Sequence, residues 1–338
     1  MGKFKFDVAI GNPPYQEETD SESTRMPPVY NLFMDEAYKC AEKVELITPA
    51  RFLFNAGFTP KKWNKKMLQD EHLKVVHYEP LSSNVFPNTD IKGGIVVSYR
   101  DETKNYGAIG TFARYEELDA IMKKVEAHHD GSLSDIISSN LSFQLSDAMI
   151  RDYPDEVHRL RTNAFTALPI FHEEEPKDQH EYIKMYGLEG VGKRAVRFVR
   201  KDYVNDIAGT MEHWKLLVAS ACGAGKFGEV LSAPIVAAPN TGYTQTFIAV
   251  GSFDRRKDAE HVEKYVKTKF CRAMLDILKI THHCPGPTWR LVPLQDFTDD
   301  SDIDWSQSIH SIDQQLYKKY GLSEDEIAFI EKNVKEMT

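Results

Sequence analysis

The sequence has few cysteines, no long apolar run and no excess of positive charge. No segment reaches the about 18 consecutive apolar residues that a membrane-spanning helix needs, so no membrane span is expected. The first residues contain no apolar stretch of the secretory type, which favours a cytoplasmic protein. The cysteines lie far apart and form no CxxC pair, so neither a disulfide framework nor a metal site is expected.

The net charge of −9 lowers the expectation of nucleic-acid binding without excluding it. Contacts to phosphates require a local basic surface and not a basic whole. Local basic clusters occur at 61–66, 193–201 and 255–257. A length of 338 residues with 41% hydrophobic content is enough for two domains that each bury a core.

Strands and helices alternate in the first hundred residues. Short apolar runs predict strands at 6–11, 44–48, 73–78 and 95–99, and helical spacing predicts helices at 30–43 and 60–72. This alternation is typical of a mostly parallel α/β sheet.

The pattern changes after the polar turn 101–105, where we place a domain boundary. The middle section mixes short helices with irregular strands, and residues 258–280 predict one amphipathic helix. The tail from 301 predicts two helices, the last one starting with a capping box from Ser323 to Glu326.

The tetrapeptide Asn12-Pro13-Pro14-Tyr15 directly follows the first predicted strand. The Asn12 side-chain oxygen and the Pro13 carbonyl can each accept a hydrogen bond from the exocyclic amine of a base. Two such acceptors draw the amine toward tetrahedral geometry and free its lone pair to attack a methyl group. Proline fixes φ and brings no competing N–H, and Tyr15 offers a flat face for an extruded base. The alternative is a strand-ending turn with a packing tyrosine.

The segment from Phe6 to Gln16 resembles motif IV of gamma-type N6-adenine DNA methyltransferases, and more narrowly the Eco57I-like restriction-modification methylases. Further segments resemble this family in the expected order, namely Tyr30–Phe33, Leu46–Phe52, Asn84–Pro87, Ile91–Ile95 and Trp289–Phe297. The resemblance implies transfer of a methyl group from S-adenosylmethionine to a flipped adenine of double-stranded DNA. It also implies that the catalytic residues are Asn12, Pro13, Pro14 and Tyr15, and that Phe86 packs against the target base.

The resemblance implies three parts. Residues 1–105 would be a partial methyltransferase domain with the C-terminal half of a Rossmann-like sheet. Residues 106–300 would be an α+β target-recognition domain, and residues 301–338 a helical segment. The basic run in the second part is expected to contact DNA phosphates, the alternative being a solvated charged face. This run consists of Lys193, Arg194, Arg197, Arg200 and Lys201.

In gamma-type enzymes the glycine-rich cofactor loop precedes motif IV, whereas eleven residues precede Asn12. The S-adenosylmethionine site is therefore expected to be incomplete. We expect this chain alone to bind the cofactor weakly or not at all, and not to methylate DNA by itself. The remaining sheet should leave an apolar edge, covered by a homodimer contact, by a partner chain with the cofactor-binding half or by a rearranged segment. The run Gly223–Gly228 matches GxGxxG, but Pro234 interrupts any following helix and no acidic residue stands at the spacing of a ribose ligand.

Two other functions compete with this interpretation. One is a non-catalytic DNA-binding specificity module or remnant of a larger restriction-modification protein, which the missing cofactor motifs favour and the intact tetrapeptide opposes. The other is an RNA or protein methyltransferase, because the same tetrapeptide serves amide and RNA amine substrates. The long region after residue 105 favours DNA, since target recognition needs additional surface.

Overall fold

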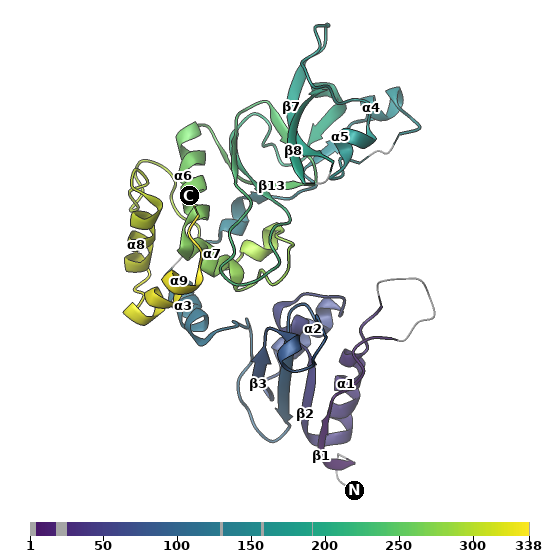
Figure 1. The fold of residues 1–338 in the computed structure, drawn as a ribbon, viewed down its shortest axis with the longest axis vertical. Helices are drawn as coiled ribbons and strands as arrows, with labels where there is room; N and C mark the ends of the chain where they lie inside the picture. The colour runs from purple at the N-terminus through teal and green to yellow at the C-terminus, as the bar shows by residue number, and fades with distance from the viewer. Residues whose placement is uncertain (1–4, 18–25, 129–130, 157–158, 191, 338) are drawn as a thin grey trace. The chain divides into compact units, whose positions relative to one another are not determined.

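The computed structural model describes residues 5–17, 26–128, 131–156, 159–190 and 192–337. The chain divides into two compact units, Met1–Asp119 and Ala120–Thr338 (Figure 1). The division falls after the predicted boundary at 105 because the next segment still hydrogen-bonds the first unit. The Tyr106 N–H donates to the Glu71 carbonyl at 2.7 Å and the Gly110 N–H to the Leu68 carbonyl at 2.8 Å. None of the helices in the described ranges is long and apolar enough to cross a membrane.

The first unit is built on a four-stranded sheet in the order β1-β2-β4-β3. Its elements are β1 (Phe6–Gly11), α1 (Tyr30–Cys40), β2 (Ala41–Pro49), the 3-10 helix η1 (Ala50–Phe54), α2 (Lys61–Leu68), β3 (Leu73–Glu79), the 3-10 helix η2 (Ser82–Asn84) and β4 (Ile95–Asp101). Helix α3 (Glu116–Glu126) spans the division between the units.

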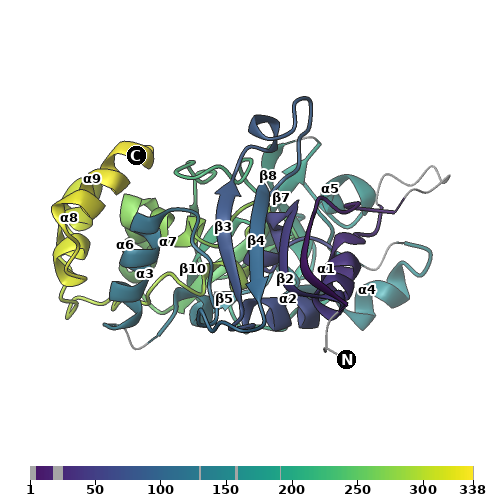
Figure 2. The same cartoon turned by 90° about the horizontal axis from the view of Figure 1, so that it is seen from below.

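The prediction of four strands is confirmed, and three of them, β1, β2 and β3, run in the same direction, as expected of a mostly parallel sheet. Only β1 and β2 pair in parallel, whereas β4 is antiparallel to both β2 and β3. A parallel connection needs a long crossover, usually a helix. The link from β3 to β4 contains no α-helix, so the chain turns back and β4 inserts between β2 and β3 (Figure 2).

Strand β1 is an edge strand of this sheet, with β2 as its one neighbour. Its apolar residues Phe6, Val8 and Ile10 alternate along the strand and are 54%, 52% and 77% exposed. An edge of this kind presents unpaired main-chain groups beside apolar side chains. This arrangement matches the exposed apolar edge expected from the sequence.

Three aromatic rings join the helices of the first unit to the end of β2. Tyr30 of α1, Phe52 of η1 and Trp63 of α2 lie with ring centroids 5.4 to 6.5 Å apart, and all are buried. Such tilted and edge-on contacts add to the free energy of burial. Helix α2 turns Trp63 and Met67 inward, one turn apart, and its lysines outward, as helical periodicity requires.

The second unit combines a four-stranded, a three-stranded and a two-stranded sheet with helices. Its elements are η3 (Leu133–Ile136), β5 (Ile137–Ser138), β6 (Phe143–Leu145), α4 (Asp147–Asp152), α5 (Ala164–Ala167), β7 (Tyr182–Glu189), β8 (Lys193–Arg200), η4 (Lys201–Tyr203), β9 (Val204–Asp206), β10 (Trp214–Ala219), β11 (Ile235–Ala237), β12 (Thr241–Tyr243), β13 (Phe247–Phe253), α6 (Arg256–Lys267), α7 (Lys269–Asp276), η5 (Gly286–Trp289), α8 (Ile309–Lys319) and α9 (Glu324–Asn333). The mixed α and β character predicted for this part is thus present.

The C-terminal helices belong to the second unit and do not form a separate segment. The Asp313 carboxylate of α8 accepts the N–H groups of Lys269 and Phe270, at 3.0 and 2.9 Å, at the start of α7. The ring of Phe270 also stacks on Tyr320, with centroids 5.1 Å apart. These buried contacts anchor the tail to the core of the unit.

Candidate active site at the end of the parallel strands

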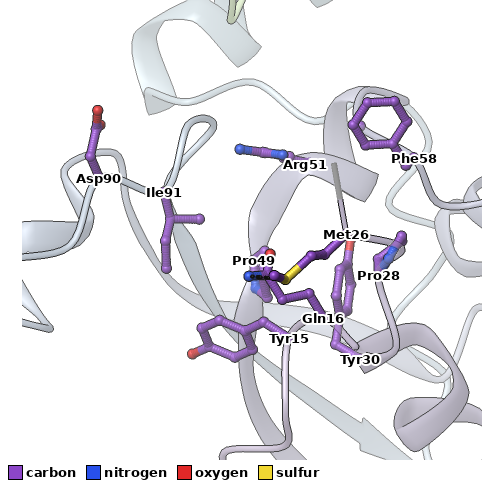
Figure 3. A pocket seen from close by; sticks show the side chains of 11 residues that line it. Tyr15, Gln16, Met26, Pro28, Tyr30, Pro49, Arg51, Phe58, Asp90 and Ile91 are labelled. Atoms are coloured by element: carbon purple, nitrogen blue, oxygen red, sulfur yellow. Dashed lines mark hydrogen bonds between the residues drawn. The ribbon is translucent and has the colours of Figure 1, made fainter. Parts of the chain in front are cut away.

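The tetrapeptide Asn12–Tyr15 emerges where the one parallel strand pair of the first sheet ends. In that pair Gly11 aligns with Leu46, so the carboxyl ends of β1 and β2 lie at the same edge of the sheet. Open α/β sheets bind their ligands at such edges. A pocket of about 330 Å³ opens here, within the usual size range of small-molecule sites (Figure 3). Its lining consists of Tyr15, Gln16, Met26, Pro28, Tyr30, Pro49, Arg51, Gly57, Phe58, Asp90 and Ile91.

The loop that carries the tetrapeptide is held beyond the strand by main-chain contacts. The Val29 N–H donates to the Tyr15 carbonyl at 3.1 Å, and the Glu17 N–H donates to the Pro27 carbonyl at 3.0 Å. Asn12 is exposed, and within the described residues no hydrogen bond occupies its side-chain amide. Its oxygen is therefore available to an incoming donor.

Tyr15 is the member of the tetrapeptide that lines the pocket. Its ring meets Phe86 edge-on, with centroids 6.4 Å apart and planes 64° from parallel. The sequence thus predicted two residues that the structure brings together, from segments far apart in the chain. The rings touch each other and do not stand as parallel plates, so a base between them requires Phe86 or Tyr15 to rotate. Their catalytic and packing roles stay predictions.

The loop behind Phe86 is fixed by Ser82. The Ser82 carbonyl accepts the Phe86 N–H at 2.8 Å, and the Ser82 hydroxyl accepts the Ile91 N–H at 2.8 Å. Ser82 itself is buried. Phe86 therefore sits on an ordered turn whose backbone is already hydrogen-bonded.

The Tyr15 hydroxyl is buried and has no hydrogen-bond partner among the described residues. Burial disfavours the charged phenolate and raises the pKa of Tyr15 from 10.0 to about 12. Tyr15 is therefore neutral throughout the neutral pH range. An aromatic face without charge suits stacking on a base and excludes a role as phenolate base.

We expect Tyr15→Phe to flatten the alkaline decline of folding stability. In the wild-type protein the unfolded chain releases this proton near pH 10.0, whereas the folded chain retains it until about 12, so stability is lost as pH rises through that window. Phenylalanine keeps the ring contact and has no proton to release. Thermal unfolding of both proteins across this window measures the difference, and two parallel curves would contradict the assignment.

Several pocket residues were not predicted as site residues, among them Arg51 and Phe58. Both follow β2, whose end lies beside the end of β1. A parallel pairing of the first two strands would have indicated them. The carboxyl ends of paired parallel strands lie at the same edge of the sheet, so the loops that follow both strands lie close together there. In the sequence, Arg51 stood out only as part of the segment Leu46–Phe52, which resembles the family.

The predicted basic run lies on the edge strand β8 and the turn after it. Alternation along a strand turns Lys193 and Arg197 to one face and Arg194 and Arg200 to the other. The run therefore does not form one continuous basic face.

The cations of this run are largely neutralised within the second unit. Arg194 donates to the Ala233 carbonyl and the other four pair with carboxylates. The N–O distances are 3.3 Å for Lys193–Glu189, 2.6 Å for Arg197–Glu189, 2.6 Å for Arg200–Asp202 and 2.8 Å for Lys201–Glu212. Their contact with DNA stays a prediction.

The glycine-rich loop Gly223–Gly228 binds carboxylates of its own unit. Glu229 accepts the N–H groups of Ala224 and Gly225 at 2.8 and 3.0 Å, and Asp276 accepts the Gly228 N–H at 2.7 Å. No helix follows the loop before β11. These three amides are thus already used, so the loop does not fit a cofactor phosphate or carboxylate.

In the comparisons with known proteins, the N-terminal part is similar to methylases. More narrowly, residues 1–86 match the family of the Eco57I restriction-modification methylase. The resemblance predicted from the sequence is thereby confirmed for this part of the chain.

A protein of Mycoplasma pneumoniae described as an uncharacterized adenine-specific methylase is 31% identical over 98 residues, which are 28% of this chain and 23% of that protein. The match thus spans less than a quarter of the relative. The crystal structure of the type IIG restriction endonuclease BpuSI covers 91% of this chain and 48% of that one at 8% identity. The TM-score of this comparison is 0.33.

Proposed function

We propose that this chain acts in site-specific N6-adenine methylation of double-stranded DNA in a restriction-modification system, as a cytoplasmic protein. The observation that carries the proposal is the position of Asn12–Tyr15. The tetrapeptide leaves the carboxyl end of a parallel strand and contributes Tyr15 to a pocket large enough for a base. It also lies within the segment that matches a methylase family.

The residues of the tetrapeptide prepare the amine of the base. The Asn12 oxygen and the Pro13 carbonyl each accept a hydrogen bond from the amine, which makes the nitrogen lone pair available. Tyr15 holds the ring of the base by stacking, and Phe86 closes on it after rotating from its present edge contact. No strong base is needed beforehand, since the amine becomes acidic only when it gains a methyl group.

S-adenosylmethionine is the methyl donor that the family implies, and it supplies an electrophilic methyl group. The glycine-rich loop of the second unit does not fit it, because Glu229 and Asp276 already hold the loop amides. We therefore expect this polypeptide by itself to bind the cofactor weakly. A second copy or a partner chain that completes the site belongs to the same proposal.

The second unit supplies the DNA-recognition surface in this proposal. Its size and mixed architecture suit the reading of a target sequence, and its basic run supplies Lys193 as the most exposed cation, with a 74% exposed side chain. Surface ion pairs of this kind are weak enough to exchange their carboxylate for a phosphate.

The direct test is a single-turnover incubation of the protein with DNA that lacks N6-methyladenine. Because cofactor binding is expected to be weak, S-adenosylmethionine is raised to saturating concentration. In the assembly that completes the cofactor site, we expect N6-methyladenine to appear at a discrete set of sites in the digested product, whereas this chain alone should not methylate the DNA. DNA binding by that assembly without any methylated base at saturating cofactor would instead identify a non-catalytic specificity module, and methylated RNA or protein would identify the third alternative.

A further inference from the structure

The pocket beside Tyr15 contains one arginine that the proposed chemistry of the amine does not use. Arg51 stands in η1, two residues after β2 ends, and lines the pocket with Tyr15. In Figure 3 the two side chains lie on opposite sides of the cavity. A base that stacks on Tyr15 therefore has a cation across the pocket from it.

The Arg51 side chain is held at two points along its length. Its Nε donates to the Lys92 carbonyl at 2.5 Å. Its stem packs against Gly57, where a Cβ would lie 3.1 Å from the arginine Cδ and where φ is +81°. A positioned guanidinium loses little conformational freedom on binding a ligand.

The outer nitrogens of Arg51 have no acidic partner in the described part of the chain. The nearby carboxylate of Asp90, which also lines the pocket, pairs with Lys92 at 2.8 Å. Arg100 of the same unit provides the contrast, because Asp70 and Glu102 both bind it at 2.7 Å. Arg51 is thus a positioned, half-exposed cation in the pocket lining, with no acidic partner among the described residues.

We propose that Arg51 binds a phosphodiester group of the DNA strand next to the extruded base. This inference rests on the proposed function, because it takes the pocket to be a base site. A flipped nucleotide turns about its own backbone, so its two phosphates stay at the mouth of the pocket. The two outer nitrogens of a guanidinium match two phosphate oxygens. Helix α2 begins shortly after Phe58, a residue of the pocket lining, and its exposed lysines add positive charge to the same unit.

The test measures binding of a duplex with 2-aminopurine opposite an abasic site, where extrusion requires little energy. We expect the wild-type protein to raise the 2-aminopurine fluorescence. Arg51→Gln should bind about 10-fold more weakly. It should also lower the slope of log K against log salt by about 0.9, the value for one lost phosphate contact. Lys39→Gln, the same loss of charge at the far end of α1, should leave both quantities unchanged.

Replacing single phosphates by neutral methylphosphonates identifies the contact. At one of the two positions flanking 2-aminopurine, the substitution should weaken the wild-type protein about 10-fold and leave Arg51→Gln unaffected. Arg51→Lys keeps the charge and the stem, so it should restore the salt slope but only part of the affinity. Melting curves of each variant exclude a folding defect.

Three results would overturn the proposal, and they differ from one another. If fluorescence rises but methylphosphonates weaken wild type and Arg51→Gln equally, Arg51 does not contact these phosphates and the proposed function stands. If Arg51→Gln weakens only S-adenosylmethionine binding, the anion is the carboxylate of that cofactor. If the wild-type protein binds the duplex with no rise in fluorescence, the base-extrusion mechanism fails and the phosphate contact with it.

Discussion

Asn12→Ala is expected to slow methyl transfer about 100-fold or more while DNA affinity stays close to that of the wild-type protein. In the proposed mechanism the asparagine oxygen accepts a hydrogen bond that strengthens as the amine gains charge, and losing such a contact typically costs a factor of about 100 to 1,000 in rate. Single-turnover rates of the assembly that completes the cofactor site, at saturating S-adenosylmethionine, measure the chemical step. Binding of the 2-aminopurine duplex measures affinity separately.

The matched control is Gln69→Ala, which removes an exposed amide at the C-terminal end of α2. This variant should methylate at the wild-type rate. Because Asn12 is exposed and its amide bonds to no other described residue, its replacement should not alter the melting temperature. A variant at Asn12 that methylates adenine at the normal rate would remove the central residue of the proposal.

Gly228→Ala is expected to destabilise the second unit by about 3 kcal/mol or more. At this position φ is +76°, and an added Cβ would lie 2.0 Å from the Asn333 carbonyl oxygen. The backbone conformation alone costs about 1–2 kcal/mol, and overpacking adds about 1–3 kcal/mol. For a unit of this size the melting temperature should fall by about 6–12 °C in thermal unfolding.

Gly209→Ala separates the two contributions. Gly209 has a φ of +66° and no atom within 4 Å of the added Cβ, so only the backbone cost applies. Its melting temperature should fall by less than half as much. Equal effects of the two substitutions would show that the loop around Gly228 can move away from the C-terminal segment. The close approach of Gly228 to Asn333 would then not limit which residue fits there.

The local parts of the fold could be predicted from the sequence. Strand β1 ends at Gly11 before two prolines, and α9 begins with the capping box of Ser323 and Glu326, both as expected. These features depend on neighbouring residues. The insertion of β4 between β2 and β3 depends on pairing between distant segments, which alternation of strands and helices does not determine.

One helix prediction failed because a single polar residue outweighed a periodic pattern. Residues 258–280 carry apolar residues at helical spacing, yet the structure has two helices that meet at Thr268. Its backbone is extended, with ψ at 149°, and its hydroxyl accepts the Cys271 N–H. Threonine at such a position starts a new helix, and both helices still bury their apolar faces.

The candidate site was predictable in its residue types more than in its geometry. Asn12 and Tyr15 could be found because their chemistry requires adjacent residues, and Phe86 because a family segment marks it. Arg51 could not, since nothing in the sequence shows that the Lys92 carbonyl and Gly57 hold it beside Tyr15. The basic run could be found in the sequence, but its acidic partners, such as Glu189 and Glu212, could not, because they come from other segments.

Strand β1 is hydrogen-bonded to the sheet along one edge, through β2, and Asn12 follows its last residue. Amides of β1 that point away from β2 exchange with solvent deuterium without waiting for the sheet to open. A strand added at this edge would bind those amides, which would slow their exchange and restrict the movement of Asn12. Deuterium uptake between Phe6 and Gly11 would therefore show whether a strand docks at the edge of the sheet next to Asn12.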